Sequence, residues 1–335
     1  MPRKMKTTRD PPSAQSFPAR LHRYLDKRAR WLAPVCALGL TVPLISDVLA
    51  GSEGTLEWMI DLASHWQWLY LVGLVLACGI LTLNDRRWAL WLLAMPLVGL
   101  TASSPAIDVG HVTIQNTEVF TIASANVNLG NRDSAALIRW LAEAKPDVVI
   151  LLEVSPEYVR GLDLLSGYPF RHLVPRHDPF GIAVLSRFPF SYVKTVEGEG
   201  GREHIESLID WKGQPIRLIA WHPMPPISPF DHTSRNQQLF ALAKAAKNSG
   251  QPAILAGDLN ATPWSNAFSG LDQAGLRRAT GLTPTWPAIG YGWMGIPIDS
   301  VLVTSQWAVM EKKVGPNLGS DHLPVLVRIA LRKDA

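Results

Sequence analysis

The stretch LGSDHLPVLVRI, residues 318–329, is the first indication of how this chain folds. From Leu323 to Ile329 an apolar residue recurs at every second position, which is typical of a strand with one buried face. Asp321 and His322 stand directly before that strand. Because Gly, Ser and Asp are common turn residues, one interpretation of this cluster is a plain turn. The other is a functional site at the end of the strand.

Several other segments have the pattern of strands, with few helices between them. Residues 148–154 and 181–189 are almost continuously apolar, as in strands that are buried on both faces. Further strands are predicted over 118–127, 253–260 and 297–304, and a hairpin over 205–222. Helices are expected over about 133–143 and 233–247. This order predicts layered α/β with mixed sheets, a β-sandwich covered by helices.

A polar residue stands where almost every predicted strand stops. Glu153 is the most unusual of these, because it interrupts the apolar run ILLEV and glutamate is almost never buried without a partner. Taken singly, each has an ordinary explanation as a turn former, a core histidine or an ion-pair member. Strands of one sheet bring their ends together, so we expect these side chains to meet: Asn126, Glu153, His222, Asp258, Asn260, Asp299, Asp321 and His322.

These residue types together favour a site for a hard divalent cation. Carboxylate and amide oxygens are the ligands that Mg²⁺ or Mn²⁺ prefers. The only two cysteines, Cys36 and Cys78, lie in the apolar front of the chain, and there is no HExxH motif, so zinc is disfavoured. Hydrolysis of a phosphate ester uses such a cation, an oriented water and charge on the phosphoryl oxygens. A Ser-His-Asp hydrolase is the rival, but no GxSxG motif is present.

The motifs SANVN, ILLEV, AWHP, AGDLNATPWS, IDSVLV and GSDHLPV follow one another in an order that resembles the endonuclease/exonuclease/phosphatase superfamily. This superfamily includes deoxyribonuclease and neutral sphingomyelinase relatives. The resemblance covers roughly residues 118–330. It implies a four-layered α/β sandwich, with two packed mixed β-sheets flanked by helices. It also implies divalent-metal-dependent hydrolysis of a phosphoester.

On the catalytic side, the resemblance implies a role for five residues. His222 would contact the phosphate or act as general acid. Asp258 and Asn260 would activate and orient the attacking water. Asp299 would support His322, which would contact the phosphate.

On the metal side, the resemblance implies that Asn126, Glu153 and Asp321 hold Mg²⁺ or Mn²⁺. Asn128 is the fallback for Asn126, because both belong to the motif SANVN. Ala125 departs from the family pattern, which often has an aromatic residue before the first asparagine.

Two further features bear on the substrate cleft. The stretch PMPPISPF, residues 223–230, is proline-rich and departs from the family pattern directly after His222. Arg187 and Arg235 are candidates for phosphate contacts, and solvated surface arginines are the alternative interpretation.

The front of the chain is apolar. Segments 31–50, 66–83 and 88–105 contain a single charged residue, Asp47. A membrane-spanning helix needs about 20 apolar residues, so we expect three transmembrane helices. A secretory signal peptide is an alternative for the first segment, and buried core helices are an alternative for all three. The expected organisation is a basic cytoplasmic arm over 1–30, a membrane domain over 31–107 and a catalytic domain over 108–335.

Loop charges predict the orientation in the membrane. The first 30 residues hold nine Lys/Arg and two Asp, and Arg86 and Arg87 follow the second apolar segment. By the positive-inside rule the N-terminus is cytoplasmic, so the catalytic domain lies on the outer, periplasmic side of the cytoplasmic membrane. From residue 108 onward there are 21 Lys/Arg and 21 Asp/Glu. The net charge of +4 is therefore no general argument for binding a polyanion.

The sequence thus predicts a membrane-anchored, metal-dependent phosphodiesterase or nuclease that acts outside the cytoplasm. Its substrate would be a nucleic acid, a phospholipid headgroup or a small phosphodiester. The lipid bilayer is its other expected partner, and no protein partner is predicted. A non-catalytic membrane-anchored binding module of the same fold is the alternative. Transport has no support, because the apolar segments contain no Lys, Arg or Glu.

Overall fold

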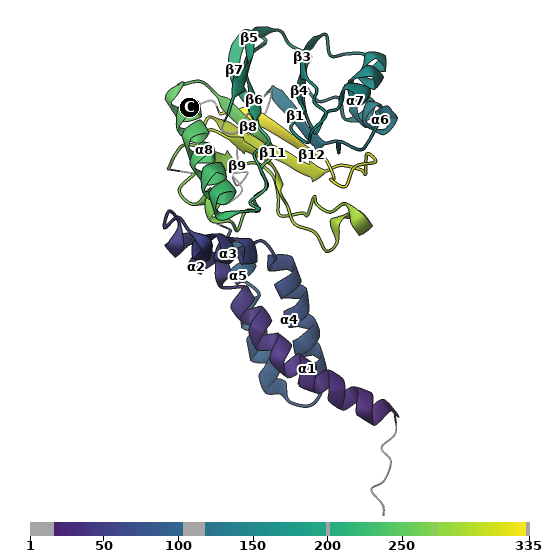
Figure 1. Ribbon diagram of the computed structural model, residues 1–335, viewed down its shortest axis with the longest axis vertical. Coiled ribbons are helices and arrows are strands. Elements are labelled where there is room, and N and C mark those ends of the chain that lie inside the picture. Colours follow the sequence, from purple (N-terminus) through teal and green to yellow (C-terminus); the bar gives the residue numbers. More distant parts are fainter. Residues whose placement is uncertain (1–16, 103–117, 199–201, 272, 333–335) are drawn as a thin grey trace, which may run out of the picture.

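Two six-stranded β-sheets face each other in the part of the chain after residue 117 (Figure 1). The protein is represented by a computed structural model, which describes residues 17–102, 118–198, 202–271 and 273–332. The first sheet contains β1 (Val119–Asn126), β2 (Val148–Leu152), β3 (Phe170–Val174), β4 (Ile182–Ser186), β11 (Trp307–Val314) and β12 (Val325–Leu331). Their spatial order is β11-β12-β1-β2-β4-β3.

The second sheet contains β5 (Phe190–Glu197), β6 (Glu203–Trp211), β7 (Gln214–Ala220), β8 (Ala253–Asp258), β9 (Arg277–Arg278) and β10 (Asp299–Val303). Their spatial order is β5-β6-β7-β8-β10-β9. Each sheet is mixed, because β1 pairs with β2 and β7 with β8 in parallel, whereas the other pairings are antiparallel. The predicted pair of mixed sheets is confirmed.

The core between the sheets follows from the alternation of side chains along each strand. In β1, Ile122 faces the other sheet, and Ala123 faces the helices on the outer side. Leu218, Ile254 and Val301 meet Ile122 from the second sheet, and all four are fully buried. Burial of one such aliphatic side chain contributes about 1.5–3 kcal/mol, so this interface is a main source of stability.

Helices cover the outer face of each sheet. On the first sheet lie α6 (Ala135–Ala144), α7 (Pro156–Gly161) and the short 3-10 helix η2 (Leu162–Leu164). On the second lies α8 (Pro229–Asn248), with the short turns η4 (Asn266–Phe268) and η5 (Ile289–Gly292) in the connections after β8. Ser228 caps α8 by accepting a hydrogen bond from the backbone N–H of Asp231. The result is the four-layered α/β sandwich that the sequence predicts.

The N-terminal segments form a separate helical region (Figure 1). We call α1 (Phe17–Gly39), α4 (Gln67–Thr82) and the 3-10 helix η1 (Arg86–Ala94) the stalk. We call α2 (Val42–Leu49) and α3 (Thr55–Ser64) the shoulder, because they lie between the stalk and the sheets. A short helix, α5 (Leu97–Leu100), ends this region among the described residues.

The expectation of three transmembrane helices is not supported. Among the described residues, Arg20–Leu49 is long and apolar enough to cross a membrane. A second span results only if Thr55–Ser64 and Gln67–Thr82, which are bent by 59°, are counted together. Instead of one helix over 88–105, the chain forms η1 and α5 with Pro96 between them, and proline cannot donate a backbone hydrogen bond. Residues 1–16 of the arm and the boundary near 107 lie outside the described residues.

The shoulder and stalk dock against the sheets through tryptophan side chains. Three indole N–H groups donate to backbone carbonyls across this interface: Trp58 to Pro226 at 2.8 Å, Trp68 to Leu282 at 2.9 Å and Trp264 to Val98 at 2.9 Å. Trp264 is also buried among the apolar side chains of the stalk. The N-terminal region is therefore fixed against the β-sandwich next to the loops that follow β7 and β8.

Candidate active site

The registers of the two sheets bring the polar strand ends together. In the first sheet, Asn126 at the end of β1 lies opposite Leu152, so Glu153 follows directly beside it. In the second sheet, Asp258 at the end of β8 pairs with Asp299 at the start of β10. The two sheets face each other, so these ends meet at one edge of the sandwich.

The side chain of Asn126 connects the two sheets by hydrogen bonds. Its amide nitrogen donates to Glu153 Oε1 at 2.8 Å and to Asp258 Oδ2 at 3.3 Å. Its Oδ1 accepts from the backbone N–H of Asn128 at 3.0 Å. Glu153 has a φ of +59°, a left-handed conformation that costs about 1–3 kcal/mol in a non-glycine residue. Such strain is common at functional sites, where it directs a side chain inward.

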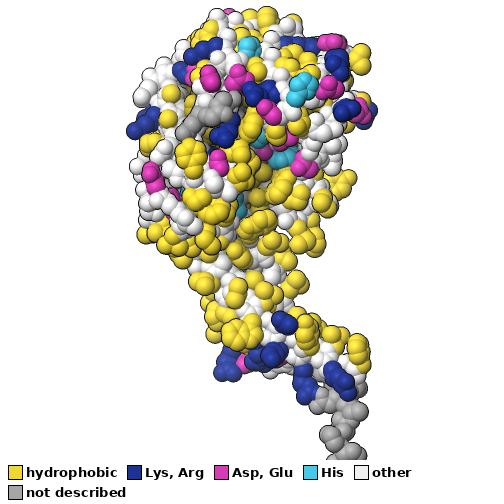
Figure 2. All heavy atoms as spheres, viewed as in Figure 1, with side chains coloured by type: hydrophobic (Ala, Val, Ile, Leu, Met, Phe, Trp, Pro, Cys, Tyr) yellow, Lys and Arg dark blue, Asp and Glu magenta, His cyan; other side chains and the backbone are white. Residues whose placement is uncertain are grey.

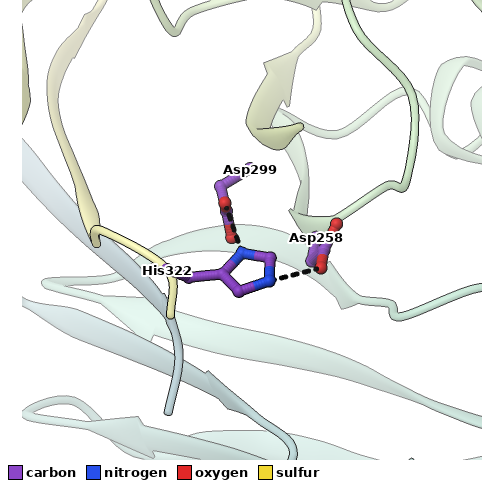
Figure 3. A group of neighbouring side chains, drawn as sticks. All are labelled: Asp258, Asp299 and His322. Atoms are coloured by element: carbon purple, nitrogen blue, oxygen red, sulfur yellow. Dashed lines mark hydrogen bonds and ion pairs between the residues drawn. The ribbon is translucent and has the colours of Figure 1, made fainter. Parts of the chain in front are cut away.

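His322 lies between two carboxylates, as Figure 3 shows. Its Nδ1 lies 3.0 Å from Asp299 Oδ2, and its Nε2 lies 3.7 Å from Asp258 Oδ2. Burial lowers the pKa of the His322 imidazole, but the carboxylates of Asp299 and Asp258 oppose this and raise the pKa to about 10. Burial raises the pKa of the Asp299 carboxyl, and His322 opposes that shift. At neutral pH the imidazole is therefore a cation that Asp299 holds in place.

His222 approaches Asp258 from the other side. Its Nδ1 lies 3.1 Å from the backbone carbonyl of Pro179, which can only accept, so Nδ1 carries the hydrogen. This leaves Nε2 directed at Asp258 Oδ2, at 3.6 Å. Asp258 thus lies between two imidazoles at 3.6 and 3.7 Å, which is within ion-pair distance and longer than a hydrogen bond.

The loop after β8 fixes Asp258 and Asn260. The backbone N–H of Asn260 donates to Asp258 Oδ1 at 2.9 Å, and its side-chain amide donates to the carbonyl of Pro223 at 3.0 Å. The preceding Gly257 allows the strands to approach closely, because a Cβ there would lie 1.9 Å from the carbonyl oxygen of Trp221. The motif AGDLN therefore needs its glycine for packing and its polar residues for the site.

Asp321 joins the site through residues that we did not predict as partners. Its Oδ1 accepts from Asn128 Nδ2 at 2.6 Å, and its Oδ2 accepts from Trp286 Nε1 at 3.1 Å. Burial raises the pKa of its carboxyl, but the Asn128 hydrogen bond and the nearby His322 outweigh this and lower the pKa. The second asparagine of SANVN was a usable signal for Asn128. Nothing in the sequence indicated Trp286.

The two arginines considered as phosphate contacts have other partners. Arg187 lies 3.8 Å from Asp147. Arg235 is buried, lies 3.3 Å from Asp61 of the shoulder and donates to the backbone carbonyl of Asn260 at 2.5 Å. Arg235 thus connects the shoulder to the loop that carries Asn260, and it does not reach the site with its own charge.

A cavity of about 640 Å³ opens beside these groups. Six of the eight predicted residues line it: Glu153, His222, Asp258, Asn260, Asp321 and His322. Asn126 and Asp299 lie behind them and hold them by hydrogen bonds. Leu62, His65 and Trp66 from the N-terminal region also line the cavity, a contribution that the sequence did not predict.

The donor set fits a hard divalent cation. Carboxylate oxygens of Glu153 and Asp258 converge on one amide group, and Asp321 lies in the same cavity. Asp258, Asp299 and His322 also form a buried group whose ligand atoms lie within 4.8 Å of one another. Because Asp299 is engaged with His322, the more accessible carboxylates of Glu153 and Asp321 are the better ligands. Oxygen donors without cysteine favour Mg²⁺ or Mn²⁺.

Comparison with known proteins agrees with this geometry. A family described as "Endonuclease/Exonuclease/phosphatase family" matches residues 123–322, which is more than half of the chain. The chain therefore belongs to the endonuclease/exonuclease/phosphatase family, whose members are generally phosphoester hydrolases. No curated protein matches the chain.

Solved structures share the fold at low sequence identity. An endonuclease/exonuclease/phosphatase from Beutenbergia cavernae is 20% identical, with a TM-score of 0.54 over 64% of this chain and 72% of that chain. D. rerio TDP2, complexed with a single-strand DNA product, is 18% identical, with a TM-score of 0.52 over 63% and 99%. The human nocturnin catalytic domain with a bound sulfate anion is 16% identical, with a TM-score of 0.52 over 64% and 94%.

Proposed function

We propose that this protein is a divalent-metal-dependent phosphoester hydrolase of the phosphodiesterase type. The observation that carries the proposal is that Glu153, Asp258 and His322 converge from both sheets around the side-chain amide of Asn126, at 2.8, 3.3 and 3.5 Å from its nitrogen. His222 adds a second imidazole 3.6 Å from Asp258. A carboxylate between two imidazoles, next to oxygen ligands, suits the attack of water on a phosphate.

The chain's own residues have distinct tasks in this scheme. Asp258, oriented by the backbone N–H of Asn260, accepts a proton from the attacking water. The imidazolium of His322, whose Nδ1 is held by Asp299, donates a hydrogen bond from Nε2 to a phosphoryl oxygen that gains charge. His222 faces the same space with Nε2 and contacts the phosphate or protonates the leaving group. A cation held by Glu153 and Asp321, with Asn126 behind them, would neutralise phosphate charge when bound.

We propose further that the stalk anchors the enzyme in a membrane with the N-terminus in the cytoplasm. Exposed apolar side chains on the stalk support this, among them Leu32, Val35, Val75, Leu76 and Leu93. Figure 2 shows such side chains along the stalk and Lys and Arg near its far end. The basic end is the cytoplasmic one by the positive-inside rule, so the β-sandwich would lie on the outer side.

The test is hydrolysis by the full-length protein in detergent, with Mg²⁺, with Mn²⁺ and with EDTA. Bis-para-nitrophenyl phosphate, a single-stranded oligonucleotide and a phospholipid are the parallel substrates. We expect metal-dependent cleavage, and Asp258→Asn should lower kcat at least about 100-fold because the general base is lost. Asp163→Asn, at an exposed position away from the site, is the control.

Two outcomes are decisive. If no substrate is cleaved with either metal, or if Asp258→Asn equals the parent, the hydrolase proposal is wrong. The non-catalytic binding module of the same fold would then be the better description.

A further inference from the structure

Apolar side chains form a wall of the same cavity that the catalytic groups line. Leu62, at the end of α3, and Trp66, directly before α4, contribute to this wall from the N-terminal region, with His65 between them in the sequence. Met224 and Ile227, from the proline-rich loop after His222, continue it. The lining of the cavity thus combines polar groups that suit a phosphate with apolar side chains that suit a hydrocarbon.

This wall is held in place by specific contacts. The indole N–H of Trp58 donates to the carbonyl of Pro226 at 2.8 Å, which ties α3 to the proline-rich loop. On the same helix, Asp61 accepts hydrogen bonds from Ser265 Oγ at 2.8 Å and from the backbone N–H of Asn266 at 2.7 Å. The apolar wall is therefore a fixed part of the folded chain.

The charges at the cavity disfavour an extended polyanion. Among the described residues that line it, none is Lys or Arg, and the imidazolium of His322 lies at the base of the site. Proteins that bind nucleic acid neutralise successive phosphates with Lys and Arg and stack bases in a positive groove. A single phosphate beside a long apolar group matches this cavity better.

The position of the cavity leads to the same conclusion. Leu62 and Trp66 lie where the shoulder continues into the apolar stalk, and Ile227 beside them is 65% exposed. Figure 2 shows hydrophobic side chains gathered over the lower part of the β-sandwich and continuing along the stalk. Large contiguous apolar surfaces of this kind mark sites for apolar ligands or membranes.

We propose that the substrate is an amphipathic phosphoester, a phosphate group joined to a long hydrocarbon chain, and that the chain binds against Leu62, Trp66 and Ile227. The proposal rests on the hydrolase function proposed above. It makes the N-terminal region a part of the substrate-binding site as well as an anchor. Acyl and prenyl chains share this chemistry.

The experiment uses the full-length protein with its preferred metal in mixed micelles. The substrates are dihexanoyl and dioleoyl phosphatidylglycerol, which share one phosphodiester, together with two other phosphodiesters, farnesyl methyl phosphate and bis-para-nitrophenyl phosphate. We expect kcat/KM to rise at least about tenfold from the short to the long acyl chain, since each buried methylene favours binding. Dioleoyl phosphatidylglycerol and farnesyl methyl phosphate, both phosphodiesters, then distinguish an acyl from a prenyl source.

Two variants test the wall itself. Ile227→Asp and Trp66→Ala should lower the ratio of kcat/KM for the long-chain lipid to that for bis-para-nitrophenyl phosphate at least about tenfold. The ratio is informative even if a variant folds less well, because misfolding lowers both activities together. Leu164→Asp is the control, since Leu164 is 82% exposed and does not line the cavity.

The outcomes separate the two proposals. Cleavage of bis-para-nitrophenyl phosphate without chain-length preference, or an unchanged ratio in both variants, overturns the amphipathic substrate and leaves the hydrolase intact. Absence of cleavage of every substrate overturns the hydrolase and, with it, this inference. A chain-length preference that the variants remove supports both.

Discussion

His322 is the residue of the site whose protonation depends most on its neighbours. The sequence places Asp299 23 positions upstream, and the register of β8 and β10 puts its carboxylate beside that of Asp258. Two carboxylates around one buried imidazole favour its charged form. A histidine that ordinarily loses its proton near neutral pH thus remains cationic.

We predict that Asp299→Asn lowers the pKa of His322 from about 10 toward its ordinary value of 6.5. The reason is that the variant removes the closest negative charge that stabilises the imidazolium. Imidazole resonances of the metal-free protein, followed by NMR as a function of pH, measure the change. Asp163→Asn is the control, and an unchanged His322 titration in Asp299→Asn would contradict the assignment.

The raised pKa of His322 makes the free energy of unfolding depend on pH in a defined direction. The folded state binds this proton more tightly than the unfolded chain, because the pKa is raised on folding. The contribution of His322 is therefore complete below its ordinary value of 6.5 and is lost as the pH rises toward 10. Asp299→Asn should weaken this loss.

At the scale of elements, α3 has a role that its sequence did not reveal. Its acidic residues, Glu57 and Asp61, stand between the first two apolar segments of the sequence, yet both are buried in the folded protein. Asp61 accepts hydrogen bonds from three elements and lies 3.0 Å from His232 and 3.3 Å from Arg235 of α8. One carboxylate therefore fastens the shoulder to the β-sandwich.

We predict that Asp61→Ala destabilises the protein by about 3–5 kcal/mol, because it leaves the buried guanidinium of Arg235 without its counter-ion. The melting temperature in detergent should fall by at least about 5 °C. Asp163→Ala, at an exposed position, should change stability by less than about 0.5 kcal/mol. Equal melting temperatures for Asp61→Ala and the parent would show that the shoulder is held by other contacts.

The periodicity of apolar residues predicts some of the strands and misses others. The central strands β1, β2, β4 and β8 have buried apolar runs, and the structure confirms them close to their expected bounds. Strands β3, β5, β9 and β11 were not predicted. All four lie at an edge of a sheet, where exposed polar residues interrupt the apolar alternation, as in β5.

At the scale of the whole molecule, the Lys and Arg side chains of the N-terminal region that the structure describes are gathered at the end of the stalk. Asp26 of α1 accepts hydrogen bonds from Arg30 at 2.8 Å and from Asn84, which follows α4, at 3.2 Å. The Asp85-Arg86-Arg87 loop therefore lies beside the basic start of α1. Two stretches that are about 55 residues apart thus form one basic end, opposite the β-sandwich in Figure 2.

We predict that alkaline phosphatase fused to the C-terminus is active in a bacterial host, because this reporter needs the oxidising periplasm to form its disulfides. A fusion directly after Arg87 should be inactive, since the basic end would remain in the cytoplasm. A green fluorescent protein fused at the same two sites should give the opposite pattern. An inactive C-terminal fusion together with an active one after Arg87 would reverse the proposed orientation.

The features that the sequence by itself determined are local ones. Two-residue periodicity marks the central strands, and polar residues at their ends mark the edge of the sandwich, as in AGDLN and GSDHLPV. The order of these motifs sufficed to predict the fold and the family, and all eight candidate residues lie in or directly behind one cavity.

Only the tertiary structure decided which surfaces meet. The bond of Asn128 to Asp321 joins residues 193 positions apart, and that of Trp58 to Pro226 joins residues 168 positions apart. Leu62 and Trp66 carry the pattern of a membrane-proximal segment, and that pattern is the same whether they face lipid or a substrate cavity. Such contacts depend on how whole layers of helices and strands pack against one another. Packing between segments that are distant in the sequence produces no periodic pattern of residues.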